Sequence, residues 1–177
     1  MIPYFLLTGV ESTGKTTLSQ ALARYFDVPL APEMARLHPE VLAGKASLDT
    51  LHELILQQNQ AIQDAQRQAL ETNRPFCLAD TGPEVLHLWS VYVWGACLLP
   101  RPVFPPGLAA AILCPPVLPW APDPLRSLPL AQDRWNLHQA YQDHLSAQDI
   151  PLWICASADP EERMAQCAGE IKRLIES

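Results

Sequence analysis

The sequence predicts an α/β fold, a single domain in which a parallel sheet is flanked by helices. Two observations lead to this prediction: short apolar runs alternate with segments of helical periodicity, and each intervening segment is long enough for a right-handed crossover. A third is size, because 177 residues suit one core that buries roughly 70% of the unfolded surface. We therefore expect one domain over residues 1–177, without room for a second catalytic domain.

The first part of the chain shows strand, helix and strand in turn. Residues 3–8 form an apolar run that does not alternate with polar residues, which is typical of a strand buried on both faces. Residues 16–26 repeat apolar side chains at helical spacing until Asp27 and Pro29 interrupt the pattern. Residues 28–31 are a candidate second strand, and Pro32, Pro39 and Gly44 leave open whether a regular element follows it.

The middle of the chain repeats this order. The apolar side chains of residues 48–72 fall on one helical stripe behind Ser47, a favourable N-cap, and so predict a long helix. Residues 75–79 read as a short apolar strand, and Asp80 follows directly at its C-terminal end. Residues 83–94 predict another helix, which begins at a proline and is stopped by a glycine.

The last part of the chain contains a proline-rich span over residues 100–129. Proline excludes a long helix or a central strand there, outside the apolar residues 109–114. Residues 134–147 predict a helix and residues 151–155 a strand, and Asp159 starts a final helix with capping-box spacing. Parallel sheets bind ligands at the C-terminal edge of their strands, so we expect the site at that edge.

Composition and charge exclude several classes of protein. An apolar fraction of 49% with 18% charged residues favours a globular chain over a disordered one. The net charge of −7 leaves no surplus of Lys and Arg for nucleic acid or an anionic membrane, so we expect neither partner. There is no basic leader and no apolar run of about 18 residues, which favours the cytoplasm. The cysteines lie far apart without a CxxC pair, which predicts buried thiols.

A complete GxxxxGK[ST] motif lies between the first expected strand and the first expected helix. Its glycines let successive N–H groups face one anion, and the helix adds its positive N-terminal dipole. Lys15 is expected to reach the β and γ phosphates, and the Thr16 hydroxyl to be a magnesium ligand. The residues expected to bind the nucleotide are Gly9, Glu11, Ser12, Thr13, Gly14, Lys15, Thr16 and Thr17.

Asp80 stands where a second magnesium ligand is needed. A Walker B carboxylate lies at the end of an apolar strand and holds the ion directly or through a water. The alternative role for Asp80 is a plain helix-capping aspartate. The expected cofactors are therefore Mg²⁺ and ATP as phosphoryl donor, and the sequence does not decide between ATP and GTP.

Five segments carry a resemblance to a known family. They are the phosphate loop as GVESTGKTT, residues 33–36 as EMAR, 80–82 as DTG, 92–95 as YVWG, and 120–127 as WAPDPLRS. With them the chain resembles, over most of its length, the ribosylnicotinamide kinase domain of NadR-like proteins in the P-loop, AAA-type ATPase and kinase family. Two positions depart from the family pattern: Gly82 replaces the second acid of DTD, and Met34 replaces a tyrosine.

The resemblance implies a nucleoside-kinase-like fold with a proline-rich lid over residues 115–134. Similar enzymes transfer the γ-phosphate of ATP to the 5′ hydroxyl of nicotinamide riboside and close an arginine-bearing lid over the phosphates. On this basis Glu33 is expected to accept the hydroxyl proton or orient the ribose, and Arg126 and Arg134 to contact the transferring phosphoryl group. The alternatives without a catalytic role are a solvated carboxylate for Glu33, and solvated or ion-paired guanidinium groups for Arg126 and Arg134. The expected catalytic residues are Lys15, Glu33, Asp80, Arg126 and Arg134.

Four further residues are weaker candidates for the acceptor site. Arg36 is placed to pair with a substrate phosphate or with Glu33, and Gln58 to project from the long helix toward the ligand. Trp89 and Trp120, like Trp94, are candidates to stack on a base or nicotinamide ring, with core packing as the alternative.

The leading hypothesis is thus an ATP-dependent kinase that phosphorylates a nucleoside, and nicotinamide riboside is the expected acceptor. A nucleoside monophosphate or other small-acid kinase is the second hypothesis. A regulatory nucleotide-binding ATPase is the third, although the guanine-specificity motif NKxD does not occur. The expected partners are ATP and a small nucleoside-like acceptor, and the sequence does not give the oligomeric state.

Overall fold

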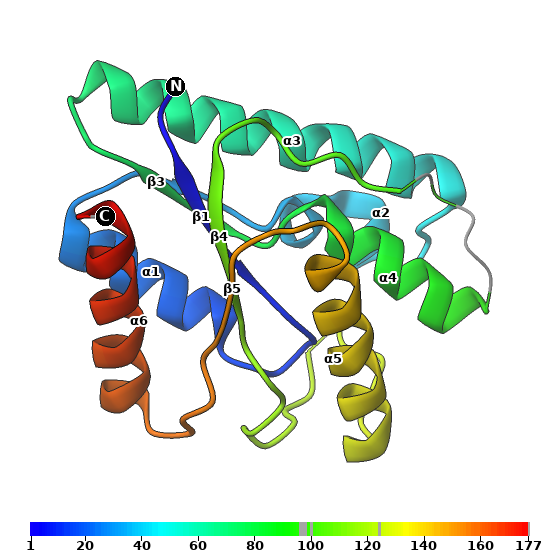
Figure 1. Cartoon of the computed structure of the whole chain (residues 1–177). Helices are drawn as coiled ribbons and strands as arrows, with labels where there is room; N and C mark the ends of the chain where they lie inside the picture. Colours follow the sequence, from blue (N-terminus) through cyan, green and yellow to red (C-terminus); the bar gives the residue numbers. More distant parts are fainter. Residues whose placement is uncertain (96–98, 100, 124, 177) are drawn as a thin grey trace.

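A five-stranded, all-parallel sheet forms the centre of the computed structural model, which describes residues 1–95, 99, 101–123 and 125–176 (Figure 1). The strand order is β2-β3-β1-β4-β5, so the first strand is central. The predicted α/β fold with a parallel sheet is confirmed. The strands are β1 (Tyr4–Thr8), β2 (Leu30–Ala31), β3 (Cys77–Asp80), β4 (Leu108–Leu113) and β5 (Leu152–Ile154).

Helices cover both faces of the sheet. Two of them, α1 and α6, pack on one face, while α3, α4 and α5 lie on the other (Figure 1). A 3₁₀ helix and a short α-helix follow β2. The helices are α1 (Lys15–Phe26), the 3₁₀ helix η1 (Met34–Leu37), α2 (Pro39–Leu42), α3 (Leu48–Glu71), α4 (Pro83–Trp94), α5 (Ala131–Ser146) and α6 (Pro160–Ile175).

The core lies on both sides of β1, because alternate side chains of a strand point to opposite faces. Phe5 and Leu7 pack under α1 and α6, whereas Tyr4 and Leu6 pack under α3. All of these side chains are at most 1% exposed. Each buried large apolar side chain contributes roughly 1.5–3 kcal/mol relative to exposure. Burial on both faces explains why the strands read as uninterrupted apolar runs.

Several boundaries differ from those predicted. Strand β2 has only two residues instead of four, because Pro29 and Pro32 flank it and proline donates no ladder hydrogen bond. Helix α5 begins at Ala131 rather than at residue 134, and Asp133 in its first turn suits the helix dipole. Two short helices, Met34–Leu37 and Pro39–Leu42, lie where the sequence left regular structure open.

The predicted start of the long helix α3 is confirmed. The Ser47 hydroxyl accepts from the Thr50 N–H at 3.2 Å, and the Thr50 hydroxyl accepts from the Ser47 N–H at 3.1 Å. These two bonds form a capping box that satisfies otherwise unpaired backbone donors. Asp159 likewise caps α6 by accepting from the Glu162 N–H at 2.8 Å.

Four of the cysteines are buried free thiols, as predicted, and Cys97 lies outside the described residues. The ends of β4 and β5 bring Cys114 and Cys155 together, and Cys167 of α6 lies beside them, with its sulfur 3.4 Å from that of Cys155. These three cysteines are far apart in the sequence, so their contact in the fold could not be predicted from their spacing. Among the described residues, none of the helices combines the length and apolar character needed to cross a bilayer. A cytoplasmic location stays a prediction.

Candidate active site

The phosphate loop turns sharply between β1 and α1. Gly9 has φ 128°, and a Cβ there would lie 2.5 Å from the Cys114 carbonyl oxygen, so only glycine fits. Gly14, with φ 73°, is the N-cap of α1, and Ser12 between them also has a positive φ of 57°. The loop thus ends at the N-terminus of a 12-residue helix, where backbone amides and the helix dipole favour an anion.

Cationic side chains hold the carbonyl groups of this loop. The Lys15 ammonium donates to the Val10 carbonyl at 2.7 Å, and the Thr13 hydroxyl donates to the same oxygen at 2.9 Å. On the other side Arg163 of α6, only 3% exposed, donates to the Thr13 carbonyl at 2.7 Å and to the Ser157 carbonyl at 3.1 Å. No sequence pattern pointed to Arg163, because it lies 150 residues from the loop it braces.

Asp80 lies at the end of β3 beside the phosphate loop. It pairs in register with Leu7 of β1 and is 2% exposed. Burial raises the pKa of its carboxyl above the usual range, and the hydrogen bond from Thr16 and the charge of Lys15 oppose that rise. Its Oδ1 has no hydrogen-bond partner among the described residues.

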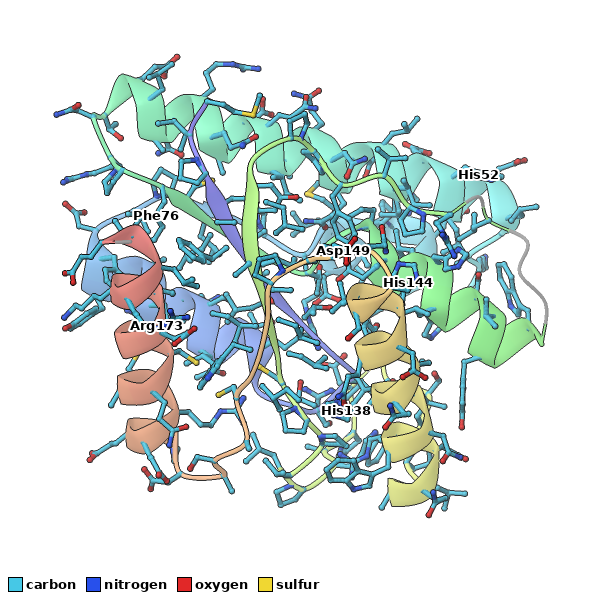
Figure 2. The ribbon with its side chains drawn as sticks, in the orientation of Figure 1. His52, Phe76, His138, His144, Asp149 and Arg173 are labelled. Carbon is cyan, nitrogen blue, oxygen red and sulfur yellow. The ribbon has the colours of Figure 1, made fainter. Side chains whose placement is uncertain are left out.

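Asp80 and Thr16 together fit the demands of magnesium. Mg²⁺ is bound through one or two carboxylates, with substrate phosphates and waters completing its shell. Within the described part of the chain, no group of three or more His, Cys, Asp or Glu side chains forms a metal site of its own. His52 lies on α3, and His138 and His144 lie on α5 (Figure 2).

Glu84 is a buried acid that the sequence reasoning missed. It is 0% exposed, and its Oε1 accepts from the Thr8 hydroxyl at 2.6 Å, while its Oε2 has no partner among the described residues. Burial raises the pKa of this carboxyl to about 7, against the hydrogen bond from Thr8 and the charge of Lys15. A Cβ at Gly82 would collide with Glu84 Oε2. The carboxyl of Glu84 therefore fills the space beside the glycine that replaces an acid.

An acidic residue in the first turn of the mainly apolar helix α4 was the available signal for Glu84. An acid near a helix N-terminus has an ordinary explanation in the helix dipole, so its burial was not apparent from the sequence.

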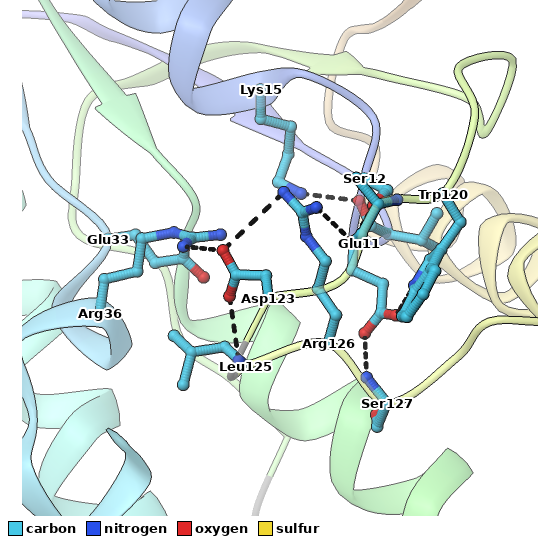
Figure 3. Close-up of polar contacts among 12 residues, drawn as sticks. Glu11, Ser12, Lys15, Glu33, Arg36, Trp120, Asp123, Leu125, Arg126 and Ser127 are labelled. Atoms are coloured by element: carbon cyan, nitrogen blue, oxygen red, sulfur yellow. Dashed lines mark hydrogen bonds and ion pairs between the residues drawn. The ribbon is translucent and has the colours of Figure 1, made fainter.

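Four charged residues form a chain across the other side of the site (Figure 3). Arg36 Nε donates to Glu33 Oε2 at 2.7 Å, and Arg36 Nη1 donates to Asp123 Oδ2 at 3.1 Å. Arg126 Nη2 lies 4.0 Å from the same Asp123 oxygen. The Leu125 N–H, Arg36 and Arg126 lower the pKa of Asp123, so its carboxylate is the stable form. The predicted pairing of Arg36 with Glu33 is observed, and Asp123 was not a candidate.

Two adjoining cavities meet at this charged chain. One has a volume of about 280 Å³ and is lined by the phosphate loop together with Glu33, Arg36 and Arg126. The other, of about 330 Å³, is lined by apolar side chains of α3 and α4 and includes Trp94. Glu33, Trp89 and Arg126 line both cavities. Trp89 thus stands where the polar cavity passes into the apolar one.

The remaining candidates lie farther from these two cavities. Gln58 is 3% exposed and donates to the carbonyls of Pro32 and Thr81 at 3.1 and 3.2 Å, which braces the segment carrying Glu33. Arg134 is 5% exposed, donates to the Leu118 carbonyl at 3.2 Å and lines neither cavity. The site roles of both residues stay predictions.

The side chain of Trp120 also makes a defined contact. Its indole N–H donates to the Glu11 carboxylate at 2.8 Å, so Glu11 is bonded to the proline-rich segment (Figure 3). Thr16 and Thr17 line the polar cavity with the rest of the loop. That Trp120 stacks on a base or nicotinamide ring stays a prediction.

Comparison with known proteins gives one family match and several structural matches. The model of a family described as AAA domain matches residues 4–163. A NadR protein in complex with NR has a TM-score of 0.79 and 18% identity, over 99% of this chain and 52% of that chain. A NadR protein with NAD and AMP-PNP gives 0.75 and 18%, over 99% and 50%. No curated protein matches the chain with significance.

Deoxyadenosine kinase from M. mycoides with bound dATP is a smaller relative in structure. Its TM-score is 0.62 at 12% identity, over 96% of this chain and 99% of that chain. The chain thus spans about half the length of the NadR structures but nearly all of this kinase. At such low identities these matches establish the fold, which is that of P-loop nucleoside kinases.

Proposed function

The chain belongs to the AAA domain family. From this premise we propose that it is an ATP-dependent kinase of a nucleoside-like acceptor, and specifically of nicotinamide riboside. One observation carries the proposal: a phosphate-loop cavity and an apolar cavity meet, and they share Glu33, Trp89 and Arg126. A kinase needs a donor and an acceptor site that open onto the same reacting atoms.

The donor phosphates would lie on the phosphate loop. The amides at the start of α1 bind the polyphosphate, and Lys15 moves from the Val10 carbonyl to the β and γ phosphates. Thr16 and the unpartnered oxygen of Asp80 are the residues that would hold magnesium. When bound, the ion neutralises charge on the phosphate oxygens.

Glu33 and Arg126 act at the boundary between the two cavities. The Glu33 carboxylate accepts the proton of the acceptor hydroxyl or orients the ribose, and Arg126 stabilises charge on the equatorial oxygens of the transferring group. Arg36 holds the Glu33 carboxylate in its orientation through their 2.7 Å contact. Arg134 would join them only if its guanidinium left the Leu118 carbonyl.

The charges on the acceptor side favour an uncharged or cationic acceptor. Arg36 is already shared between Glu33 and Asp123, so two carboxylates face one guanidinium there. A nucleoside monophosphate would bring further negative charge next to these two carboxylates, where Arg36 is already occupied by both. The positively charged ring of nicotinamide riboside instead suits the face of Trp89. This balance supports the riboside over the monophosphate alternative.

The test is an acceptor screen. Purified protein is incubated with MgATP or MgGTP and a panel of nucleosides, nicotinamide riboside and nucleoside monophosphates, and acceptor-dependent ADP or GDP is measured. We expect turnover with the riboside and far less with monophosphates, and none in Lys15→Ala. Nucleotide hydrolysis that no acceptor accelerates would contradict the proposal and favour a regulatory ATPase.

A further inference from the structure

Glu11, in the phosphate loop, uses its side chain on another part of the molecule. Its Oε1 accepts from the Trp120 indole N–H at 2.8 Å and from the Leu128 N–H at 2.7 Å. Its Oε2 accepts from the Ser127 N–H at 2.8 Å (Figure 3). One carboxylate therefore binds both ends of residues 120–128, a segment whose described part we call the clasped segment.

The next loop residue adds to the same contact. The Ser12 hydroxyl accepts from the Ala121 N–H at 3.2 Å, and within the clasped segment Arg126 donates to the Ala121 carbonyl at 2.5 Å. Arg126 is thereby tied to the segment's first residues, which the loop holds. Its guanidinium lines the phosphate cavity from this position.

These contacts leave the Glu11 carboxylate with no role as a phosphate ligand. A carboxylate facing a polyphosphate would repel it, whereas here three N–H donors compensate the negative charge. Two of the donors are the consecutive backbone amides of Ser127 and Leu128, and each bonds a different carboxylate oxygen. Both oxygens must therefore act as acceptors. Glutamine offers one acceptor oxygen and an NH₂ group, so it fails to match this pattern.

We propose that Glu11 is a positioning residue that clasps residues 120–128 to the phosphate loop and so holds Arg126 over the transferring phosphoryl group. This inference rests on the proposed kinase function for its kinetic consequence. The clasp itself is a structural claim that stands apart from activity. It links the two halves of the site, because the same loop that binds the donor also sets the arginine above it.

The kinetic test is a double-mutant cycle between Glu11 and Arg126. Glu11→Gln is expected to lower kcat about 10-fold or more with little change in the KM for ATP, and Arg126→Ala to lower it further. If Glu11 acts through Arg126, the double variant is no slower than Arg126→Ala alone. Effects that multiply in the double variant would overturn the proposal. Glu53→Gln, an exposed glutamate of α3, is the control and should keep wild-type kinetics.

A second measurement does not need kinase activity. Trypsin cleaves after Arg126 only when the clasped segment opens, so Glu11→Gln should be cut there several-fold faster than wild type and Glu53→Gln at the wild-type rate. Thermal melting establishes that the variants are folded. Equal cleavage rates in Glu11→Gln and wild type would overturn the clasp. A protein that lacks kinase activity but shows the faster cleavage would contradict the proposed function and leave the clasp supported.

Discussion

The donor and acceptor sides of this site are built in different ways. The donor side is a contiguous loop whose shape follows from Gly9 and Gly14 and from the strand and helix that flank it. The acceptor side gathers side chains from η1, α4 and the proline-rich segment, held by ion pairs such as Arg36 with Asp123. A site built from backbone groups tolerates few substitutions. In a site built from charged side chains, a substitution alters which ligand is preferred. Variants on the two sides should therefore differ in kind as well as in size.

The largest effect is expected at Lys15. Replacing it with alanine removes one preorganised cation at the phosphates, which should reduce kcat/KM by roughly 10²–10³. Steady-state assays with MgATP measure this, with the unfolding temperature recorded to exclude a folding defect. The matched control is Lys45→Ala, an exposed lysine outside the cavities, which should be unaffected. Wild-type turnover in Lys15→Ala would show that this lysine of the phosphate loop takes no part in phosphoryl transfer.

Glu84 beneath the donor loop predicts a pH-dependent stability. Burial raises its pKa from 4.5 to about 7, so the folded state binds this proton more tightly than the unfolded state. The stabilisation is complete below the unfolded pKa and is lost as pH rises through about 7, a loss of about 3 kcal/mol. Glu84→Gln stays neutral at every pH and should lack this loss.

Chemical denaturation of wild type and Glu84→Gln between pH 5 and pH 8 measures the effect. The difference in unfolding free energy between the variant and wild type should grow from pH 5 to about pH 7 and then level off. A constant difference between the two proteins would show that the Glu84 carboxyl is ionised in the folded state throughout.

The same contrast explains what the sequence could predict. Gly9 and Lys15 were accessible because they belong to one local motif, in which a glycine turn joins a strand to a helix. Asp80 was accessible because it directly follows an apolar strand. Asp123 and Glu84 were not, since their roles depend on which distant side chains they meet. Arg36 was a candidate, but its sharing between two carboxylates needed the structure. Arg134, expected at the lid on resemblance, is buried by packing that its sequence neighbours do not reveal.

On the acceptor side, Glu33→Gln should reduce kcat by about 10²-fold, the lower end for loss of a general base, because phosphoryl transfer depends mostly on positioning and electrostatics. The amide keeps the size and one acceptor oxygen for Arg36. We expect the KM for ATP to remain near wild type, since Glu33 lies on the acceptor side. A large rise in the KM for ATP with kcat unchanged would place Glu33 in donor binding instead.

The smallest change in rate, and the most specific test of the two-sided site, is expected for Asp123→Asn. The substitution removes one negative charge next to Arg36 and Arg126 while keeping the side-chain shape. Arg36 then has a guanidinium face free for an added phosphate, so kcat/KM for nucleoside monophosphates should rise about 10-fold, or about 1.4 kcal/mol. Turnover of an uncharged or cationic nucleoside should change less. Competition assays with both acceptor classes measure the ratio, and an unchanged ratio would mean that acceptor selectivity is set by the apolar cavity around Trp89 and Trp94 rather than by these charges.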